Sequence, residues 1–245
     1  MSVLLYESRD QIATITINRP DKRNAVTEEV SVRLREAWQR FNASDDRVVI
    51  LTGAGDAAFC GGADLSDLPK AFWQCVPGVG VPMDKPLIAA VSGWCVGGGL
   101  VFAMMADMAI GTETAKLYYP EAKVGVFGGV MAGLVSRMPH KLAMEIMLVG
   151  EEVDARRAYE VGFFNKLVPV GQQVEVARQV ARKIAANAPM VVSAIKRFAD
   201  ATLPRGPAEH FYPEMGRLAT IMASADLQEG VAAFREKRAP RFAGR

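Results

Sequence analysis

Apolar and polar residues alternate along the first strand that the sequence predicts. Within residues 11–18 the stretch ATITI places apolar side chains on every second position, the period of a half-buried strand. Together with residues 3–7 it predicts a hairpin. Residues 19–26 then predict a turn, because Pro20 and Asn24 interrupt regular structure.

The pattern next changes to the period of a helix. Thr27 is suited to cap a helix whose apolar positions repeat near every 3.6 residues, at Val30, Leu34, Trp38 and Phe41. Residues 47–52 are continuously apolar, which is typical of a strand buried on both faces. Residues 53–64 are rich in glycine and predict a loop.

A second unit repeats the order of strand, glycine loop and helix. The expected segments are a strand at 86–91, a loop at 93–99, a helix at 100–106, strands at 107–110 and 115–119, a loop at 125–129 and a helix at 130–138. The rest is mostly helical, at 140–149, 154–161, 172–187, 189–202, 208–223 and 227–237, with one strand near 164–168. Asp226 and Glu229 have the spacing of a capping box for the last helix.

This order predicts an α/β fold with a helical end. No low-complexity linker divides the chain, so we expect one catalytic core over residues 1–188 and a helical C-terminal region over residues 189–245. The repeat lies in the order of elements, since the sequence itself shows no fixed period.

Composition narrows the function classes. The chain has 245 residues, 29 basic and 27 acidic, with a formal charge of +2. This balance argues against a partner such as nucleic acid or a membrane surface, which favours a concentrated basic face. Two histidines without a Cys/His cluster predict no metal site. The three cysteines (Cys60, Cys75, Cys95) and the absence of a signal-peptide pattern favour free thiols in the cytoplasm.

Two glycine-rich loops are the main candidates for chemistry. They span residues 59–64 (FCGGAD) and 93–99 (GWCVGGG), and we expect each to follow a buried strand and to lead into a helix. The N–H groups at a helix start can hold an anion, and glycine lets a ligand approach the backbone closely. Neither loop fits a dinucleotide fingerprint or a nucleotide P-loop. Plain tight turns remain possible for either loop alone, but a pair of N–H donors is what an acyl-transfer or enolate site requires.

These loops resemble the two oxyanion-hole loops of the crotonase superfamily, the enoyl-CoA hydratase/isomerase family. Four further segments resemble family motifs: residues 19–26 (RPDKRNAV), 84–91 (DKPLIAAV), 119–125 (YPEAKVG) and 229–238 (EGVAAFREKR). The matches follow one another in the family's order along almost the whole chain. The resemblance implies a spiral of ββα units, a C-terminal helical oligomerisation region, and trimers or dimers of trimers.

The resemblance also implies roles for individual residues. The N–H groups of Ala63 and Gly98 would hold a thioester oxygen, and Glu121 would be the catalytic acid/base. The substrate would be an acyl-CoA, with coenzyme A as part of the substrate and no separate cofactor. The residues expected along the CoA and substrate path, besides Ala63 and Gly98, are Arg23, Ala25, Asp64, Leu65, Gly129, Phe234 and Lys237, the last two commonly serving a neighbouring subunit.

The sequence departs from the hydratases of this family at one acid. Those enzymes hold water between two glutamates, but the position of the first is Val101 here. A single Glu121 suits a double-bond shift, and an apolar pocket would raise its pKa towards neutrality. Tyr119, Phe127 and Trp94 are candidates to line that pocket.

The sequence is therefore compatible with several functions. Isomerisation or hydration of an enoyl-CoA leads, and other single-acid members of the family cleave carbon–carbon bonds. Val101 also leaves room for a CoA-thioester-binding protein that has lost catalysis. RNA binding, a side role in some family members, finds little support in the near-neutral charge.

Overall fold

The computed structural model describes residues 2–245 and contains two β-sheets. In the larger sheet β1 pairs antiparallel with β2, and the remaining neighbours are parallel. Its order is β1 (Leu4–Arg9), β2 (Ile12–Ile17), β3 (Val48–Gly53), β5 (Leu87–Val91), β7 (Met108–Thr112) and β10 (Lys166–Val168).

The smaller sheet contains strands that come after strands of the larger sheet in the sequence. Its order is β4 (Ala58–Cys60), β6 (Trp94–Val96), β8 (Lys116–Tyr118) and β9 (Val153–Asp154). Each successive pair, from β3–β4 to β7–β8, adds one strand to each sheet, so the chain advances as a spiral. The predicted α/β spiral is confirmed. However, β4 and β6 lie in segments predicted as loops, because three residues beside glycines carry no readable period.

Nine α-helices complete the described part of the chain. They are α1 (Glu28–Ala43), α2 (Gly98–Met105), α3 (Glu121–Val124), α4 (His140–Val149), α5 (Ala155–Glu160), α6 (Gln173–Ala185), α7 (Pro189–Thr202), α8 (Pro207–Met222) and α9 (Ala225–Glu236). Three 3₁₀ helices lie at Pro20–Lys22, Phe72–Cys75 and Val130–Ser136. The last replaces the helix expected at 130–138, where Gly129 and Gly133 weaken α-helical propensity.

Helix caps show where local sequence is informative. The Thr27 side chain caps α1 by accepting from the Val30 N–H, as predicted. The prediction for α9 was wrong, because Ser224 is its cap. Asp226 instead accepts from the N–H groups of Ala243 and Gly244, which fold back onto the helix. Such a contact between distant segments leaves no local pattern.

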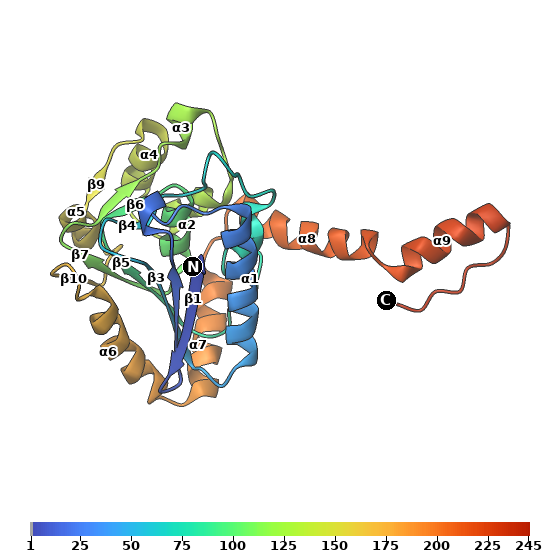
Figure 1. Cartoon of the computed structure of the whole chain (residues 1–245), viewed down its shortest axis with the longest axis horizontal. Helices are drawn as coiled ribbons and strands as arrows, with labels where there is room; N and C mark the ends of the chain where they lie inside the picture. The colour runs from blue at the N-terminus through green and yellow to red at the C-terminus, as the bar shows by residue number, and fades with distance from the viewer. Residues whose placement is uncertain (1) are drawn as a thin grey trace.

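The core lies on both faces of the large sheet. Strand β3 is buried throughout, so Val49 and Leu51 join the main core while Val48 and Ile50 face the opposite side. On that opposite side α6 packs with a stripe of buried alanines, Ala177, Ala181 and Ala185. Figure 1 shows α1 and α6 on different sides of the sheet, which explains the continuous apolar sequence of β3.

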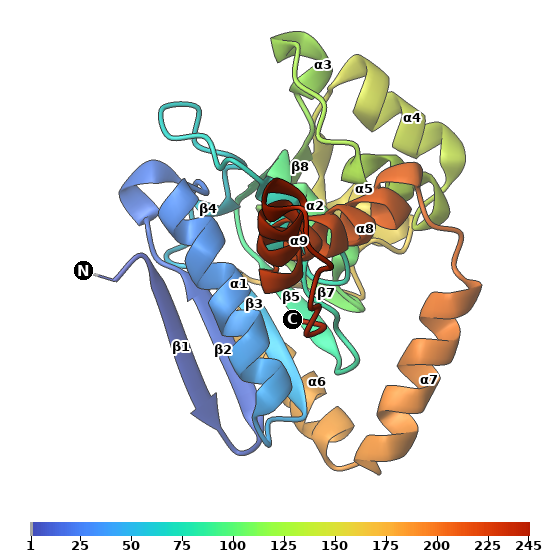
Figure 2. The same cartoon turned by 90° about the vertical axis from the view of Figure 1, so that its right-hand side faces the viewer.

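The C-terminal helices leave the body of the molecule. In Figure 1, α8 and α9 extend sideways as an arm, and Figure 2 views this arm end-on with α7 standing beside the body. Phe234 on α9 is 86% exposed. Across residues 2–245, no helix has both the length and the apolar composition needed to cross a bilayer.

Candidate active site

The first glycine loop is shaped by the turn at residues 19–26. The Val26 N–H donates to the Gly62 carbonyl over 2.8 Å, and the Asp64 N–H donates to the Val26 carbonyl over 2.9 Å. These bonds hold the chain on both sides of Ala63. The Ala63 N–H itself donates no hydrogen bond within residues 2–245. The loop leads into an irregular segment, so the prediction of a helix directly after it was wrong.

Two buried or part-buried side chains fix this turn. The Asn24 side chain donates to the carbonyls of Ala54 and Ala58, and it accepts from the Arg19 N–H. Arg19 in turn donates to Asp64 over 3.0 Å and to the Ala25 carbonyl. The first loop therefore depends on hydrogen bonds from another part of the chain.

The second glycine loop ends at the start of α2. Gly97 precedes the helix at φ 52° and ψ −114°, a conformation open to glycine, and its N–H donates to the Tyr118 carbonyl. Gly98 is the first helical residue. Its N–H has no acceptor in the described chain, as expected at a helix start.

The two loops touch one another. A Cβ placed on Gly62 would lie 3.3 Å from the Gly98 nitrogen and 3.0 Å from the Val96 carbonyl oxygen. Ala63 and Gly98 both line one cavity of about 310 Å³. Two residues whose N–H groups have no acceptor in the described chain thus line the same cavity, an arrangement suited to holding an oxyanion.

Glu121 lies in the same cavity. It opens the short helix α3, and its carboxylate contacts the second loop, where a Cβ on Gly97 would lie 2.5 Å from Oε1. Its Oε2 is buried and has no hydrogen-bond partner among the described residues. Burial raises the pKa of Glu121 to about 7, although its own backbone N–H opposes the shift. A carboxyl with this pKa is suited to taking up and returning a proton near neutral pH.

The remaining wall of the cavity is mostly apolar. Val101, at the position of the family's other acid, is 6% exposed and lines the cavity. Tyr119 also lines it, as expected, and burial followed by the charge of Glu121 raises the pKa of this phenol. The other lining residues are Leu68, Pro69, Lys70, Ala71, Phe72, Trp73, Val126, Gly128, Val130, Met131 and Tyr212.

Two aromatic residues predicted for this pocket lie elsewhere. Trp94 packs edge-on against Tyr118 beneath the Lys116 ammonium, and Phe127 is 73% exposed. The aromatic residues that sequence reasoning missed are Phe72, Trp73 and Tyr212. Their contacts join segments far apart in the chain, and only the paired aromatics FW at 72–73 offered a local signal.

The residues expected along the CoA path fall into two groups. Arg23, Ala25, Asp64 and Leu65 lie on the turn and loop beside Ala63, with Arg23 and Leu65 exposed. Gly129 is the N-cap of the 3₁₀ helix Val130–Ser136 and follows Gly128, which lines the cavity. Phe234 and Lys237 lie on the α9 arm, and within one chain neither lines the cavity of Glu121.

Cys60 lies beside the first loop but does not suit a nucleophilic role. Burial raises the pKa of its thiol to about 12, which disfavours the reactive thiolate. All three cysteines are free, as predicted, and the structure shows that all three are buried. Cys60 is therefore a small packing residue.

Known proteins of similar sequence and structure place this geometry in context. The family model described as Enoyl-CoA hydratase/isomerase matches residues 7–245. An (E)-benzylidenesuccinyl-CoA hydratase from Thauera aromatica is 35% identical, covering 97% of this chain and 98% of that protein. A carnitinyl-CoA dehydratase from Proteus mirabilis is 33% identical and covers 97% of each chain.

A solved structure gives the same result. The crystal structure of an enoyl-CoA hydratase from Mycobacterium tuberculosis H37Rv has a TM-score of 0.76 and 36% identity, with 99% of each chain covered. The fold, the order of the motifs and these relatives agree. The chain therefore belongs to the enoyl-CoA hydratase/isomerase family of the crotonase superfamily, a family of enzymes.

Proposed function

We propose that this enzyme moves a proton on an enoyl-CoA thioester through an enolate, with Glu121 as its single acid/base. The observation that carries the proposal is that Glu121, whose buried Oε2 has no partner among the described residues, lines the same cavity as Ala63 and Gly98. These N–H groups hold the thioester oxygen. Each contributes about 3–4 kcal/mol as the oxygen gains negative charge.

The proposed step is a double-bond shift. The Glu121 carboxylate removes a proton from the α carbon of a 3-enoyl thioester, and the electron pair moves onto the thioester oxygen. The resulting carboxylic acid returns that proton to the γ carbon, which yields the 2-enoyl thioester and restores Glu121. Val101 favours this reaction because, among the described residues that line the cavity, there is no second acid to hold a water molecule.

Hydration is the second candidate, and the names of the relatives favour it, since they are hydratases and dehydratases. In this reaction Glu121 accepts a proton from water as the water oxygen bonds to the β carbon. Glu121 then returns the proton to the α carbon. Neither reaction needs a cofactor beyond the coenzyme A of the substrate.

We further propose that the chain works as a homotrimer or a dimer of trimers. The α8–α9 arm projects from the body and exposes large apolar side chains, among them Leu218, Ile221 and Phe234. In such an assembly Phe234 and Lys237 meet the CoA bound to a neighbouring subunit. Arg23, Ala25, Asp64 and Leu65 contact the CoA of their own subunit.

The test is a panel of 2-enoyl-, 3-enoyl- and 3-hydroxyacyl-CoA substrates incubated in deuterated buffer and analysed by mass spectrometry. We expect deuterium at the α or γ carbon, and Glu121→Gln lowers the rate by a factor of roughly 10²–10⁴. Glu151→Gln, which removes an exposed carboxylate, is the control. Unchanged turnover by Glu121→Gln contradicts the mechanism, and no exchange by the wild type indicates a thioester-binding protein.

A further inference from the structure

The cavity beyond Glu121 is walled by aromatic rings. Phe72, Trp73, Tyr119 and Tyr212 come from three separate segments of the chain and all line it. Among the lining residues, Lys70 and Glu121 have charged side chains, and the others are apolar, aromatic or glycine. A charged or strongly polar acyl group would therefore lose its hydration here without gaining enough hydrogen-bond partners.

The aromatic wall is held in one arrangement. The rings of Trp73 and Tyr212 stack with their centroids 5.3 Å apart and an angle of 1° between their planes. The Tyr212 hydroxyl donates to the Gly128 carbonyl over 3.0 Å, which ties α8 to the loop after Glu121. One turn further along α8, a Cβ on Gly216 would lie 3.5 Å from Trp73, so the indole packs against that helix.

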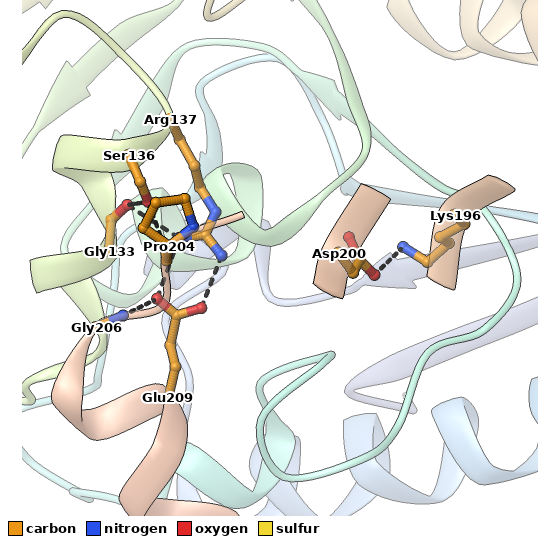
Figure 3. Close-up of polar contacts among 8 residues, drawn as sticks. All are labelled: Gly133, Ser136, Arg137, Lys196, Asp200, Pro204, Gly206 and Glu209. Carbon is orange, nitrogen blue, oxygen red and sulfur yellow. Dashed lines mark hydrogen bonds and ion pairs between the residues drawn. The ribbon is translucent and has the colours of Figure 1, made fainter. Parts of the chain in front are cut away.

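The start of α8 is also fixed to the body. The Glu209 carboxylate accepts from both terminal nitrogens of Arg137, over 3.1 and 2.7 Å, and from the Gly206 N–H. Figure 3 shows Arg137 and Glu209 facing one another, with Gly206 beside the carboxylate. Glu209 is 2% exposed and precedes Tyr212 by three residues on the same helix. The wall is thus preorganised, which lowers the entropic cost of binding a ligand.

We propose that the cavity selects acyl groups that carry an aryl ring, which packs against Trp73 and Tyr212. The proposal rests on the proposed function, because it assumes that Ala63 and Gly98 hold the thioester. An aryl ring gains stacked or edge-to-face contacts that an alkyl chain of similar size does not make. A cavity of about 310 Å³ gives such a ring room beside Glu121.

The experiment measures the affinity of saturated thioesters, which bind without turnover. Isothermal titration compares 3-phenylpropanoyl-CoA, hexanoyl-CoA and 4-trimethylammoniobutanoyl-CoA on the full-length protein. We expect the phenyl thioester to bind about tenfold more tightly than hexanoyl-CoA. Trp73→Leu and Tyr212→Leu each reduce this preference to about twofold or less.

Matched variants distinguish the loss of an aromatic ring in the cavity wall from a general disruption of the fold. Phe211→Leu removes the neighbouring ring on α8, which is 59% exposed and does not line the cavity, so it keeps the preference. Trp73→Phe and Tyr212→Phe keep an aromatic ring at each position and retain most of the preference. If a leucine variant does not fold, the binding preference of the phenylalanine variant at the same position is compared with that of the wild type.

The outcomes distinguish this inference from the proposed function. Equal binding of the phenyl and hexanoyl thioesters overturns the aryl preference, while Glu121-dependent deuterium exchange would still support the enzyme. Tightest binding of the trimethylammonium thioester also overturns it and indicates that the rings hold a cation. If none of the thioesters binds, both the inference and the proposed function fail.

Discussion

The two glycine loops bring similar backbone groups to one cavity by different means. At Gly98 the unpaired N–H follows from position, since the first turn of any helix lacks internal acceptors. At Ala63 no helix follows, and the N–H has no acceptor in residues 2–245, because Val26 forms its hydrogen bonds with the neighbouring Gly62 and Asp64. One loop is organised by its own helix, and the other by a turn from elsewhere in the chain.

Because of this difference, we expect substitutions near the two loops to affect different properties of the protein. The second loop lies directly against Glu121, so a change there alters the placement of the proposed acid/base. The first loop depends on Asn24 and Arg19, so a change in those residues alters the stability and placement of the loop. Substitutions in the two regions therefore have distinguishable results in activity and in unfolding measurements.

Among substitutions in the two loops and the turn that supports them, the largest effect is expected for Gly97→Ala in the second loop. The new Cβ would lie 2.5 Å from Glu121 Oε1, and the alanine would have to adopt the positive φ of 52° that Gly97 has. Moving a catalytic group by about 1 Å can cost roughly 100-fold in rate, so kcat/KM should fall by about that factor. Steady-state kinetics with the best substrate of the panel gives the value.

Gly171→Ala is the matched control for that substitution. Gly171 has a φ of 85°, and a Cβ there would meet nothing within 4 Å. This substitution therefore places an alanine at a positive φ away from the cavity, and the activity of the variant should equal that of the wild type. Equal losses in both variants would mean that strain, and not contact with Glu121, explains the result.

The next largest effect is expected for Asn24→Ala in the turn that supports the first loop. Asn24 is fully buried, and its removal leaves the carbonyls of Ala54 and Ala58 without this donor. We expect a loss of about 2–4 kcal/mol in the free energy of unfolding. Urea denaturation measures it. Asn18→Ala, which removes a single exposed hydrogen bond to the Ser2 carbonyl, should cost less than about 1 kcal/mol.

A smaller effect concerns the acid that the second loop contacts. Burial raises the pKa of Glu121 from 4.5 to about 7, so the folded protein holds this proton more tightly than the unfolded chain. Stability therefore falls as pH rises from 4.5 through 7, and the full loss is present above pH 7. Removing the ionisable group should remove this pH dependence.

Glu121→Gln should accordingly be more stable than the wild type by about 1–2 kcal/mol at pH 8, a value reduced for partial solvent exposure. Near pH 4 the two proteins should differ little, because Glu121 is protonated in both the folded and unfolded wild type. Denaturant unfolding at the two pH values tests this. A difference that is the same at both values would contradict the buried, destabilised carboxylate.

Local patterns in the sequence predicted the parts of this site that depend on local structure. The Thr27 cap and a helix after the second glycine loop needed only neighbouring residues, although this helix begins at Gly98 and not at residue 100 as predicted. Ala63 and Glu121 came from family motifs, and the structure brings both into the cavity of Gly98. Whether they act as proposed stays a prediction.

Long-range contacts explain what the sequence did not predict. Trp73 and Tyr212 stack although they lie far apart in the chain, and no periodicity links them. Trp94 looked equally suitable for the pocket, but its strand position turns it towards Tyr118. Which aromatic residue meets the cavity is decided by packing between segments, which a pattern within one segment does not contain.

The smallest effect we predict concerns the ion pair that joins the turn to the first loop. Arg19 and Asp64 lie 3.0 Å apart, with side chains 19% and 14% exposed. Arg19 also donates to the Ala25 carbonyl, and Asp64 also accepts from Ser66. Each single substitution therefore removes the ion pair and also changes one of these hydrogen bonds. A double-mutant cycle of Arg19→Leu and Asp64→Asn isolates the shared contribution.

We expect a coupling of about 0.5–1 kcal/mol in urea unfolding, since the pair is part-buried and still partly reached by solvent. If the turn positions the first loop, both single variants should also raise KM more than they lower kcat. The same cycle on the exposed pair Lys116 and Glu152 should show weaker coupling and unchanged kinetics. Strong coupling with unchanged KM would mean that the pair stabilises the fold without placing Ala63, and the two loops would then differ less than their hydrogen bonds indicate.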